Sequence, residues 1–281
     1  MTEASIGTRV LEAQATQATL CVGIDPHAET LDSWGLPDDA SGAESFGKAL
    51  RDAVIAAGVS VVKPQVALFE RMGLSGLRVL SQLMSELREA GIGVIADVKR
   101  GDIGSSLQGY ADAWLRPGSD FEADAMTAVA YQGLGSLRPA FDLAAENGKT
   151  VFVLSATSNP EGADIQQATT DSGNTVAGEI LTGAQALVGA SPTSRGTVGV
   201  VIGATVNHTT WGIDAEAAPD IPILAPGFGH QGVTIEQAPG LFGKALGRVL
   251  VTASRSVAGD SREGLDTRMT EHLKAVADAT V

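Results

Sequence analysis

The residues most suited to chemistry lie in the segment IADVKRGDIGSS, residues 95–106. Side chains of a β-strand repeat their direction every second residue, so Asp97 and Lys99 would share one face of a strand placed here. Near the end of a barrel strand that face is the interior, where a carboxylate and an ammonium would lie side by side in a partly dry cavity. Asp102 follows shortly after, and a lysine between two carboxylates would be kept charged and oriented as a proton donor. The alternative is an ion-pair network that closes the end of the barrel.

A second lysine lies in the preceding apolar run. Lys63 stands in VVKPQVALFE, where a buried strand would not normally place an ammonium without a partner. Asp97 on the next strand is its natural partner, and a bound phosphoester or sugar hydroxyl is the functional alternative. Asp25 ends the run LCVGID directly before Pro26, so its carboxylate either accepts hydrogen bonds from ligand hydroxyls or forms a turn.

Two glycine-containing segments have the composition of an anion site. PGFGHQG, residues 226–232, and TASRSVAG, residues 252–259, would follow the last two strands of the chain. Glycine-rich turns with free amides, together with Gln231 and Arg255, are the components of a barrel phosphate site. PGFGHQG alone would indicate only a flexible loop, but its pairing with Arg255 favours phosphate binding.

A repeating architecture must position these segments. Short runs rich in Val and Ile alternate with longer stretches of helical apolar spacing, which is typical of βα units around a parallel sheet. The expected strands are LCVGID (20–25), VSVVKPQV (59–66), GVIADVK (93–99), AMTAVA (125–130), VFVLSAT (151–157), TVGVVIGA (197–204), IPILAPGF (221–228) and RVLVTASRS (248–256).

Three helices are expected with particular ends. The stretches 43–58 and 76–91 are amphipathic, and each ends in a glycine suited to a helix C-cap. The closing stretch 261–280 has a helical apolar face, with Ser261 as its expected N-cap and Glu263 in its first turn.

Eight such units predict an α/β protein with a closed (β/α)₈ barrel. We expect one domain over residues 1–281, including an N-terminal helix, and an open doubly wound sheet is the alternative fold. The polar stretches 25–42 and 155–174 follow the first and fifth strands. They would form long loops at the C-terminal rim, where barrel enzymes place their active sites.

Composition disfavours several classes of function. The 281 residues are 44% hydrophobic and 19% charged, and no apolar stretch approaches the roughly 20 residues of a bilayer crossing, so we expect a cytoplasmic protein without membrane association. The single cysteine, Cys21, permits no intrachain disulfide, and the four histidines lack metal-ligand spacing, so we expect no metal. The formal net charge of −14 disfavours nucleic acid as a partner.

Taken together, the motifs resemble those of a known enzyme family. GIDP (23–26), VVKPQVALFE (61–70), ADVKRGDIGSS (96–106), VLSATSNPEG (153–162), PGFGHQG (226–232) and SRSV (254–257) are similar, in this order, to the orotidine 5'-phosphate decarboxylase family in its longer bacterial form. The resemblance covers nearly the whole chain. It implies a barrel that dimerises across its C-terminal face and converts orotidine 5'-monophosphate to uridine 5'-monophosphate and carbon dioxide in pyrimidine synthesis.

The resemblance also implies roles for individual residues. Lys63, Asp97, Lys99 and Asp102 match the charged tetrad of the family, with Lys99 as the proton donor and Asp102 reaching into the partner subunit's site. Asp25 and Lys63 match residues that contact the ribose, Ser155 matches a contact to the pyrimidine, and Pro226 matches an apolar wall near the ring. Gln231 and Arg255 match the phosphate contacts. Ser106 stands where the family has a threonine at the subunit interface. Val233 breaks the last position of the family's PGxGxQGG pattern, which affects the backbone of the phosphate loop.

The implied chemistry agrees with the residues. Loss of carbon dioxide from C6 of the pyrimidine leaves a carbanion without an adjacent electron sink, so a fixed ammonium is the available stabiliser and proton source, and no cofactor is expected. Asp97 near the departing carboxylate would oppose it electrostatically. Phosphate held far from C6 would help close the rim loops, with 155–174 and 229–236 as the candidate lids.

Two other functions stay open. A related barrel could be a magnesium-dependent sugar-phosphate decarboxylase, although Asp102 and the SATSNPEG loop resemble the nucleotide enzyme more closely. A catalytically silent nucleotide-binding protein would be expected to have lost Asp97 or Lys99, and both are present.

Overall fold

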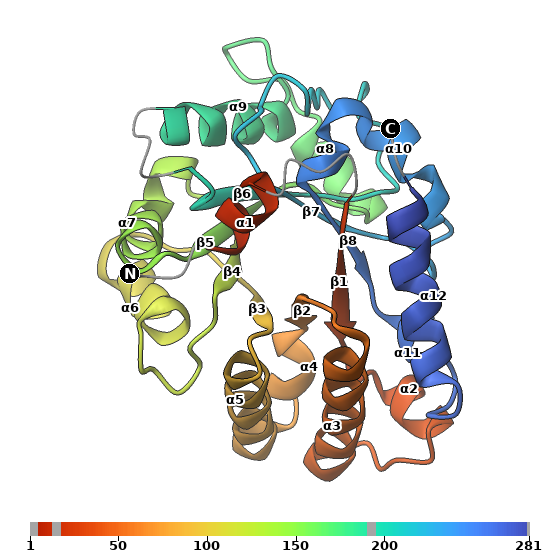
Figure 1. Cartoon of the computed structure of the whole chain (residues 1–281). Helices are drawn as coiled ribbons and strands as arrows, with labels where there is room; N and C mark the ends of the chain where they lie inside the picture. Colours follow the sequence, from red (N-terminus) through yellow and green to blue (C-terminus); the bar gives the residue numbers. More distant parts are fainter. Residues whose placement is uncertain (1–4, 13–17, 190–194, 280–281) are drawn as a thin grey trace.

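The computed structural model describes residues 5–12, 18–189 and 195–279. Eight parallel strands form a closed barrel in sequence order, with helices around the outside (Figure 1). β1 pairs with β8, with Cys21 opposite Thr252, so the predicted barrel is confirmed and the open doubly wound sheet is wrong. The strands are β1 (Thr19–Ile24), β2 (Val61–Pro64), β3 (Gly93–Arg100), β4 (Ala125–Ala128), β5 (Thr150–Ala156), β6 (Val198–Ile202), β7 (Ile223–Pro226) and β8 (Val249–Ala253).

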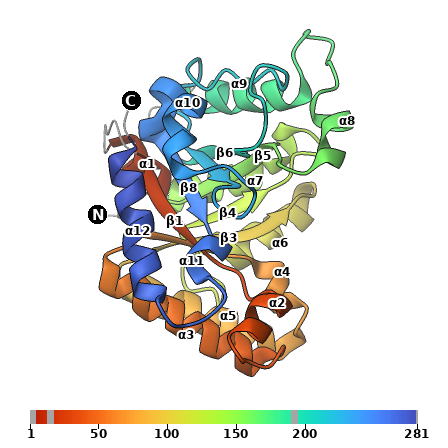
Figure 2. The same cartoon turned by 90° about the vertical axis from the view of Figure 1, so that its right-hand side faces the viewer.

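Helices connect and cover the strands. The α-helices are α1 (Ile6–Glu12), α2 (Ala28–Ser33), α3 (Ala40–Ala57), α4 (Val66–Glu70), α5 (Gly73–Glu89), α6 (Gly104–Leu115), α7 (Arg138–Asn147), α8 (Ala163–Gln166), α9 (Val176–Gly189), α10 (Ala238–Phe242), α11 (Arg255–Ala258) and α12 (Leu265–Asp278). The 3₁₀ turns are η1 (Leu134–Leu137), η2 (Pro160–Gly162), η4 (Ile235–Gln237) and η5 (Gly243–Arg248). In Figure 2 the connection that contains α8 projects at the upper right. No helix of the described residues has the length and apolar character needed to cross a membrane.

The hydrophobic core has two parts. The larger one lies between the strands and the surrounding helices. The smaller one fills the barrel interior, and Ile6 and Val10 of α1 belong to it. The backbone N–H of Gly7 also donates to Oγ1 of Thr150, the first residue of β5, at 3.0 Å. Helix α1 therefore closes the N-terminal end of the barrel.

In each of the first four strands, the residue that lies two positions after the buried interior residue is close to the candidate site. The smaller core contains one residue from each of these strands, Cys21, Val61, Ile95 and Ala125. Two residues further along the same strands stand Gly23, Lys63, Asp97 and Thr127. Because strand side chains repeat direction with a period of two, this second set forms the next layer towards the C-terminal rim.

The predicted helix ends are partly correct. α3 ends at Gly58, which has the left-handed conformation of a C-cap with φ of 73°. α12 begins at Leu265 rather than near Ser261, so the predicted N-cap and the place of Glu263 in the first turn are wrong. Gly264 takes a left-handed conformation that interrupts the helix, and the Arg268 guanidinium donates to the carbonyls of Ser261 and Glu263 and so holds the preceding turn.

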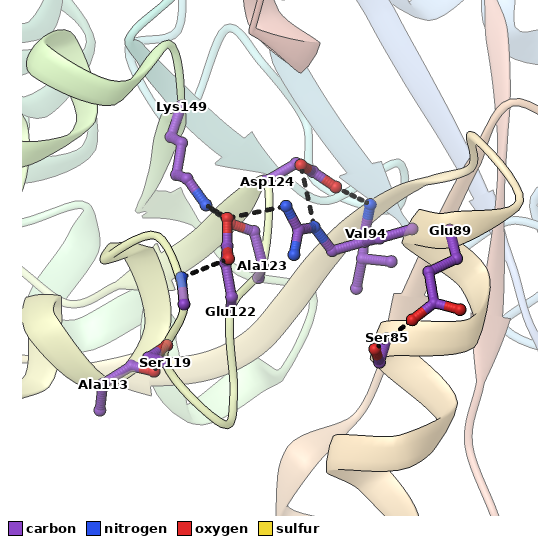
Figure 3. Close-up of polar contacts among 11 residues, drawn as sticks. Ser85, Glu89, Val94, Ala113, Ser119, Glu122, Ala123, Asp124 and Lys149 are labelled. Carbon is purple, nitrogen blue, oxygen red and sulfur yellow. Dashed lines mark hydrogen bonds and ion pairs between the residues drawn. The ribbon is translucent and has the colours of Figure 1, made fainter.

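An ion-pair network ties the N-terminal side of the barrel together (Figure 3). Nζ of Lys149 lies 2.8 Å from Oε1 of Glu122 and donates to the carbonyl of Ala123 at 2.6 Å. Arg88 donates to the same Glu122 oxygen at 2.7 Å and to Asp124 at 3.3 Å. Asp124 also accepts the backbone N–H of Val94 on β3, visible in Figure 3. The network joins α5, β3 and the segments that precede β4 and β5.

Candidate active site

The centre of the candidate site is the carboxylate of Asp97 on β3. Nζ of Lys63, on β2, lies 2.8 Å from its Oδ2, and Nζ of Lys99 lies 2.6 Å from its Oδ1. Oγ1 of Thr127, on β4, donates to the same Oδ1 at 2.8 Å. The structure therefore brings Lys63, Asp97 and Lys99 together, and the predicted partnership of Lys63 with Asp97 is present.

Lys99 has an unusual backbone. Its φ of 47° is the one positive value among the described residues other than glycine. The β3–β4 pairing shifts register between Ala96 and Arg100, so this part of β3 is irregular. The backbone N–H of Lys99 donates to Oγ1 of Thr127 at 2.9 Å instead of to a neighbouring strand carbonyl.

Burial and neighbouring charges change the pKa values of Asp97 and Lys63. Burial alone would raise the pKa of Asp97, but the attraction of Lys63 and Lys99 outweighs it and holds this pKa well below its ordinary value. Burial disfavours the Lys63 ammonium, yet the charges of Asp97 and Asp25 raise its pKa above the ordinary value. Lys63 and Asp97 are therefore a fixed pair of opposite charges.

The pKa of Lys99 changes in the opposite direction to that of Lys63. Removal of water from its ammonium, together with the like charge of Lys63, lowers its pKa below the ordinary value, although Asp97 opposes this change. Burial outweighs the effect of Asp97 on this pKa. Asp102 does not contact Lys99 among the described residues of the single chain, so the placement of Lys99 between two carboxylates stays a prediction. A lysine with a lowered pKa gives up its proton more readily, which suits a proton donor.

Asp25 presents an unused acceptor beside this cluster. Its Oδ1 is buried and accepts no hydrogen bond from the described residues. A buried carboxylate oxygen without a donor is costly unless a ligand supplies one. Asp25 is also close enough to raise the pKa of Lys63. A hydroxyl group of a ligand would satisfy this oxygen.

Sequence reasoning missed two residues of the cluster, Gln65 and Thr127. Oε1 of Gln65 accepts from Nζ of Lys99 at 3.2 Å, and its backbone forms a parallel bridge with Asp97. Thr127 is the single polar residue of the apolar run AMTAVA, and this isolated polar side chain was the feature of the sequence that could have indicated a role in the site. Its alignment with Asp97 depends on the strand register, which the sequence does not display.

The β7 and β8 ends carry the predicted anion site. Gln231 is exposed in the loop after β7, and Arg255 is half-buried at the start of α11. The Arg255 side chain makes no ion pair or hydrogen bond with the residues that the structure describes. Its guanidinium is therefore available to a ligand anion.

The loop after β7 is held by its own amides. The N–H of Gly229 donates to the carbonyl of Val233 at 2.7 Å, and that of Gly232 donates to Gly229 at 2.9 Å. These two amides are not free, contrary to the expectation for this turn, because they close the turn itself. Gly229 and Gly232 have φ of 79° and 93°, whereas Val233 lies outside this left-handed region. The valine therefore fits without strain.

Ser155 and Pro226, two more predicted ligand contacts, lie at the ends of β5 and β7. Ser155 is buried at the end of β5, and its hydroxyl donates to the carbonyl of Ala177 at 2.8 Å. That hydroxyl is left as an acceptor for a ligand, since its single proton is already used. Pro226, the last residue of β7, is half-buried, and its carbonyl accepts from Ala204 at 2.8 Å.

Asp102 and Ser106 are not part of the cluster in the single chain. Oδ1 of Asp102 accepts from the backbone N–H of Ile103 at 2.8 Å. Ser106 is exposed on α6. Neither residue makes a hydrogen bond or ion pair with Lys63, Asp97 or Lys99 among the described residues.

The site can therefore bind an anionic ligand and transfer a proton. Arg255 offers a charge at one side, Asp25 offers an acceptor for hydroxyls, and Lys99 offers a proton next to the Asp97 carboxylate. Among residues 5–12, 18–189 and 195–279, no group of three or more His, Cys, Asp or Glu side chains is arranged to hold a metal ion.

Comparisons with known proteins agree on one family. The model of the orotidine 5'-phosphate decarboxylase / HUMPS family matches residues 18–265. The orotidine 5'-phosphate decarboxylase of Salinispora arenicola is 48% identical over 90% of this chain and 89% of its own. That of a Nocardioides strain is 47% identical over 89% and 90%. A solved structure from Streptomyces avermitilis, also named as an orotidine 5'-phosphate decarboxylase, superposes with a TM-score of 0.90 at 41% identity, covering 99% of this chain and 97% of that one.

Proposed function

This chain belongs to the orotidine 5'-phosphate decarboxylase / HUMPS family, and we infer that it converts orotidine 5'-monophosphate to uridine 5'-monophosphate and carbon dioxide in pyrimidine biosynthesis. It is a carboxy-lyase. The structural observation that carries this function is the Lys99 ammonium, held 2.6 Å from the Asp97 carboxylate at the C-terminal end of a barrel strand.

We propose that Lys99 protonates C6 of the pyrimidine. The bond between C6 and the carboxylate carbon breaks, its electron pair stays on C6, and carbon dioxide leaves. The Lys99 ammonium stabilises this developing charge and then donates its proton to C6, which leaves a neutral amine to be protonated again from solvent. The lowered pKa of Lys99 supports this role.

Asp97 and Lys63 would prepare this step. Lys63 binds Oδ2 of Asp97, which leaves Oδ1 toward Lys99 and keeps the carboxylate ionised. An ionised Asp97 beside the substrate carboxylate would favour its departure, and it would direct the Lys99 ammonium. The reaction in this scheme uses no cofactor.

The other candidate residues would position the nucleotide. The buried, unpartnered Oδ1 of Asp25 supports a contact with a ribose hydroxyl, with Lys63 beside it. Arg255 and Gln231 would bind the phosphate. Ser155 would accept a hydrogen bond from the pyrimidine, and Pro226 would form an apolar wall near the ring.

We propose a homodimer that joins the C-terminal faces of two barrels. Asp102 and Ser106 would then enter the partner subunit's site. Exposed side chains beside Asp102 and on α6 support this contact, because Ile103 is 61% exposed and Tyr110 37%. Exposed groups of this kind on the rim are typical of a surface that another protein covers.

Two further features stay predictions. The segments 155–174 and 229–236 would close over the bound nucleotide as lids, and the cytoplasm would be the location of the enzyme. Nucleic acid and membrane are not expected as partners.

The absorbance of orotidine 5'-monophosphate during incubation with chelator-treated protein tests this function. We expect rapid loss of the orotate absorbance with the wild-type chain and with Lys48→Ala, a control lysine in an exposed ion pair with Glu44. Lys99→Ala should lose at least about 1,000-fold in kcat, within the range of general acid catalysis with charge stabilisation. Nucleotide binding without turnover would favour the silent nucleotide-binding protein. No binding, together with magnesium-dependent turnover of a sugar phosphate, would favour the other decarboxylase.

A further inference from the structure

The hydroxyl of Thr127 makes two hydrogen bonds of fixed direction. Its Oγ1 accepts from the backbone N–H of Lys99 at 2.9 Å and donates to Oδ1 of Asp97 at 2.8 Å. A backbone N–H only donates and an ionised carboxylate only accepts, so the hydroxyl proton has to lie on the Asp97 side. Thr127 thereby joins the backbone of Lys99 to the carboxylate of Asp97.

Thr127 meets Lys99 where its backbone is unusual. A left-handed conformation such as the φ of 47° at Lys99 is strained for a residue with a side chain. The β3–β4 register shifts across this point, between Ala96 and Arg100. The hydroxyl of Thr127 satisfies the Lys99 N–H there, and Thr127 as a whole is 1% exposed, so water does not replace this hydroxyl freely.

Thr127 also restricts the carboxylate of Asp97. Oδ1 accepts from both Thr127 and the Lys99 ammonium, while Oδ2 accepts from Lys63. Without Thr127 the carboxylate would be held by the two lysines alone, both of which have long flexible side chains. Thr127 reaches the same oxygen from a short side chain on a barrel strand, so it restricts the rotation of the carboxylate.

We propose that Thr127 is a positioning residue of the decarboxylation, which sets both the backbone of the proton donor and the orientation of its carboxylate partner. This inference rests on the proposed function of Lys99 and Asp97. Thr127 acts through these two residues and needs no contact with the nucleotide. A displacement of a reacting group by about 1 Å costs on the order of 100-fold in rate, so this positioning affects turnover.

Three variants at this residue separate its hydroxyl from its shape. Thr127→Val keeps the branched side chain and removes both hydrogen bonds. Thr127→Ser keeps the hydroxyl and removes the methyl group. Thr127→Ala removes both the hydroxyl and the methyl group. The Ser and Ala pair keeps the comparison available if the valine variant does not fold.

Thr150 provides a matched control at the opposite end of the barrel. It is fully buried, its Oγ1 accepts from the N–H of Gly7 at 3.0 Å, and it donates to the carbonyl of Gly196 at 2.8 Å. Thr150→Val therefore removes one hydrogen bond accepted from a backbone N–H and one donated to an oxygen, as Thr127→Val does, although the oxygen here is a neutral carbonyl. It measures what the loss of a buried threonine hydroxyl does to folding alone.

We expect Thr127→Val and Thr127→Ala to lower kcat about 100-fold with KM changed less than about threefold. Thr127→Ser should stay within about fivefold of the wild-type kcat, because it restores both bonds. Thr150→Val should lower the Tm and leave kcat unchanged. Equal kcat values for the serine and alanine variants, or a kcat of Thr127→Val within threefold of wild type, would overturn the inference. If the wild-type chain itself does not decarboxylate orotidine 5'-monophosphate, that result would instead contradict the proposed function.

Discussion

Lys63 and Lys99 bind the two oxygens of a single carboxylate, that of Asp97, at 2.8 Å and 2.6 Å, yet their pKa values change in opposite directions. Lys63 is buried on β2 between Asp97 and Asp25, whose charges raise its pKa. Lys99 has Asp97 as its ion-pair partner among the described residues, but the loss of water around its ammonium and the positive charge of Lys63 together outweigh that partner and lower its pKa. The same carboxylate thus holds one lysine as a permanent charge and the other as a usable acid.

The pKa of Lys99 predicts the alkaline side of the pH–rate profile. Protonation of C6 requires the ammonium, so kcat/KM should fall as pH rises through the pKa of Lys99 in the free enzyme. Burial lowers this pKa below the ordinary value of 10.5, so the midpoint should lie below pH 10.5. Circular dichroism over the same pH range serves as the control for unfolding. A constant kcat/KM up to that pH would contradict Lys99 as the proton donor.

Asp97 predicts how stability depends on pH. Its pKa in the folded state lies below its ordinary value of 3.8, so its ionised form stabilises the fold fully above about pH 4 and progressively less as pH falls toward the folded pKa. Asp97→Asn should therefore lower the free energy of unfolding more at pH 7 than at pH 3.5. Urea titrations of both proteins at the two pH values measure this, and a difference that is constant with pH would be inconsistent with an ionised Asp97.

Arg255 should act through the phosphate of the substrate. Arg255→Ala should lower kcat/KM by about 100-fold or more, since a charge-assisted contact to phosphate is lost. Orotidine without its phosphate should be a poor substrate for the wild type and for the variant to the same degree. Arg262→Ala, at an exposed position just beyond α11, is the control. The Tm should not change, and an unaffected kcat/KM would remove Arg255 from the phosphate site.

A shared site can be tested with two inactive variants. Lys99→Ala and Asp102→Asn should each be inactive as homodimers, because every site lacks one required residue. If Asp102 serves the partner subunit's site, a mixed dimer contains one site with both substitutions and one intact site. Equal mixing after exchange of subunits should then restore about a quarter of the wild-type activity. Each variant mixed with itself is the control, and no recovery in verified mixed dimers would place Asp102 in its own subunit's site.

The ion-pair network at the other end of the barrel should affect stability alone. Lys149→Met leaves Glu122 with Arg88 as its remaining cation and should lower the free energy of unfolding by about 2 kcal/mol, with kcat unchanged. The matched control Lys244→Met removes an ion pair whose lysine side chain is 84% exposed. That control should change the unfolding free energy by less than about 0.5 kcal/mol. A kcat reduced by Lys149→Met at unchanged stability would link this network to the site.

The sequence by itself determined the eight βα units and the chemical identity of the strand ends. Alternation with a period of two predicted that Asp97 and Lys99 share a face, because the pleat of a strand repeats every second residue wherever the strand lies. Apolar runs at regular intervals were enough to predict eight βα units. The partnership of Lys63 with Asp97 followed from the cost of an unpaired buried charge.

The tertiary structure decided how these groups act on one another. Thr127 meets Lys99 and Asp97 because of the β3–β4 register and its local shift, which depend on closure of the barrel and on no local pattern. The pKa of Lys99 is lowered because it depends on how much water and which charges surround the ammonium, and these follow from the packing of neighbouring strands around it. Spacing along the chain fixes which residues share a face, whereas register and burial are set by neighbouring segments far away in the sequence.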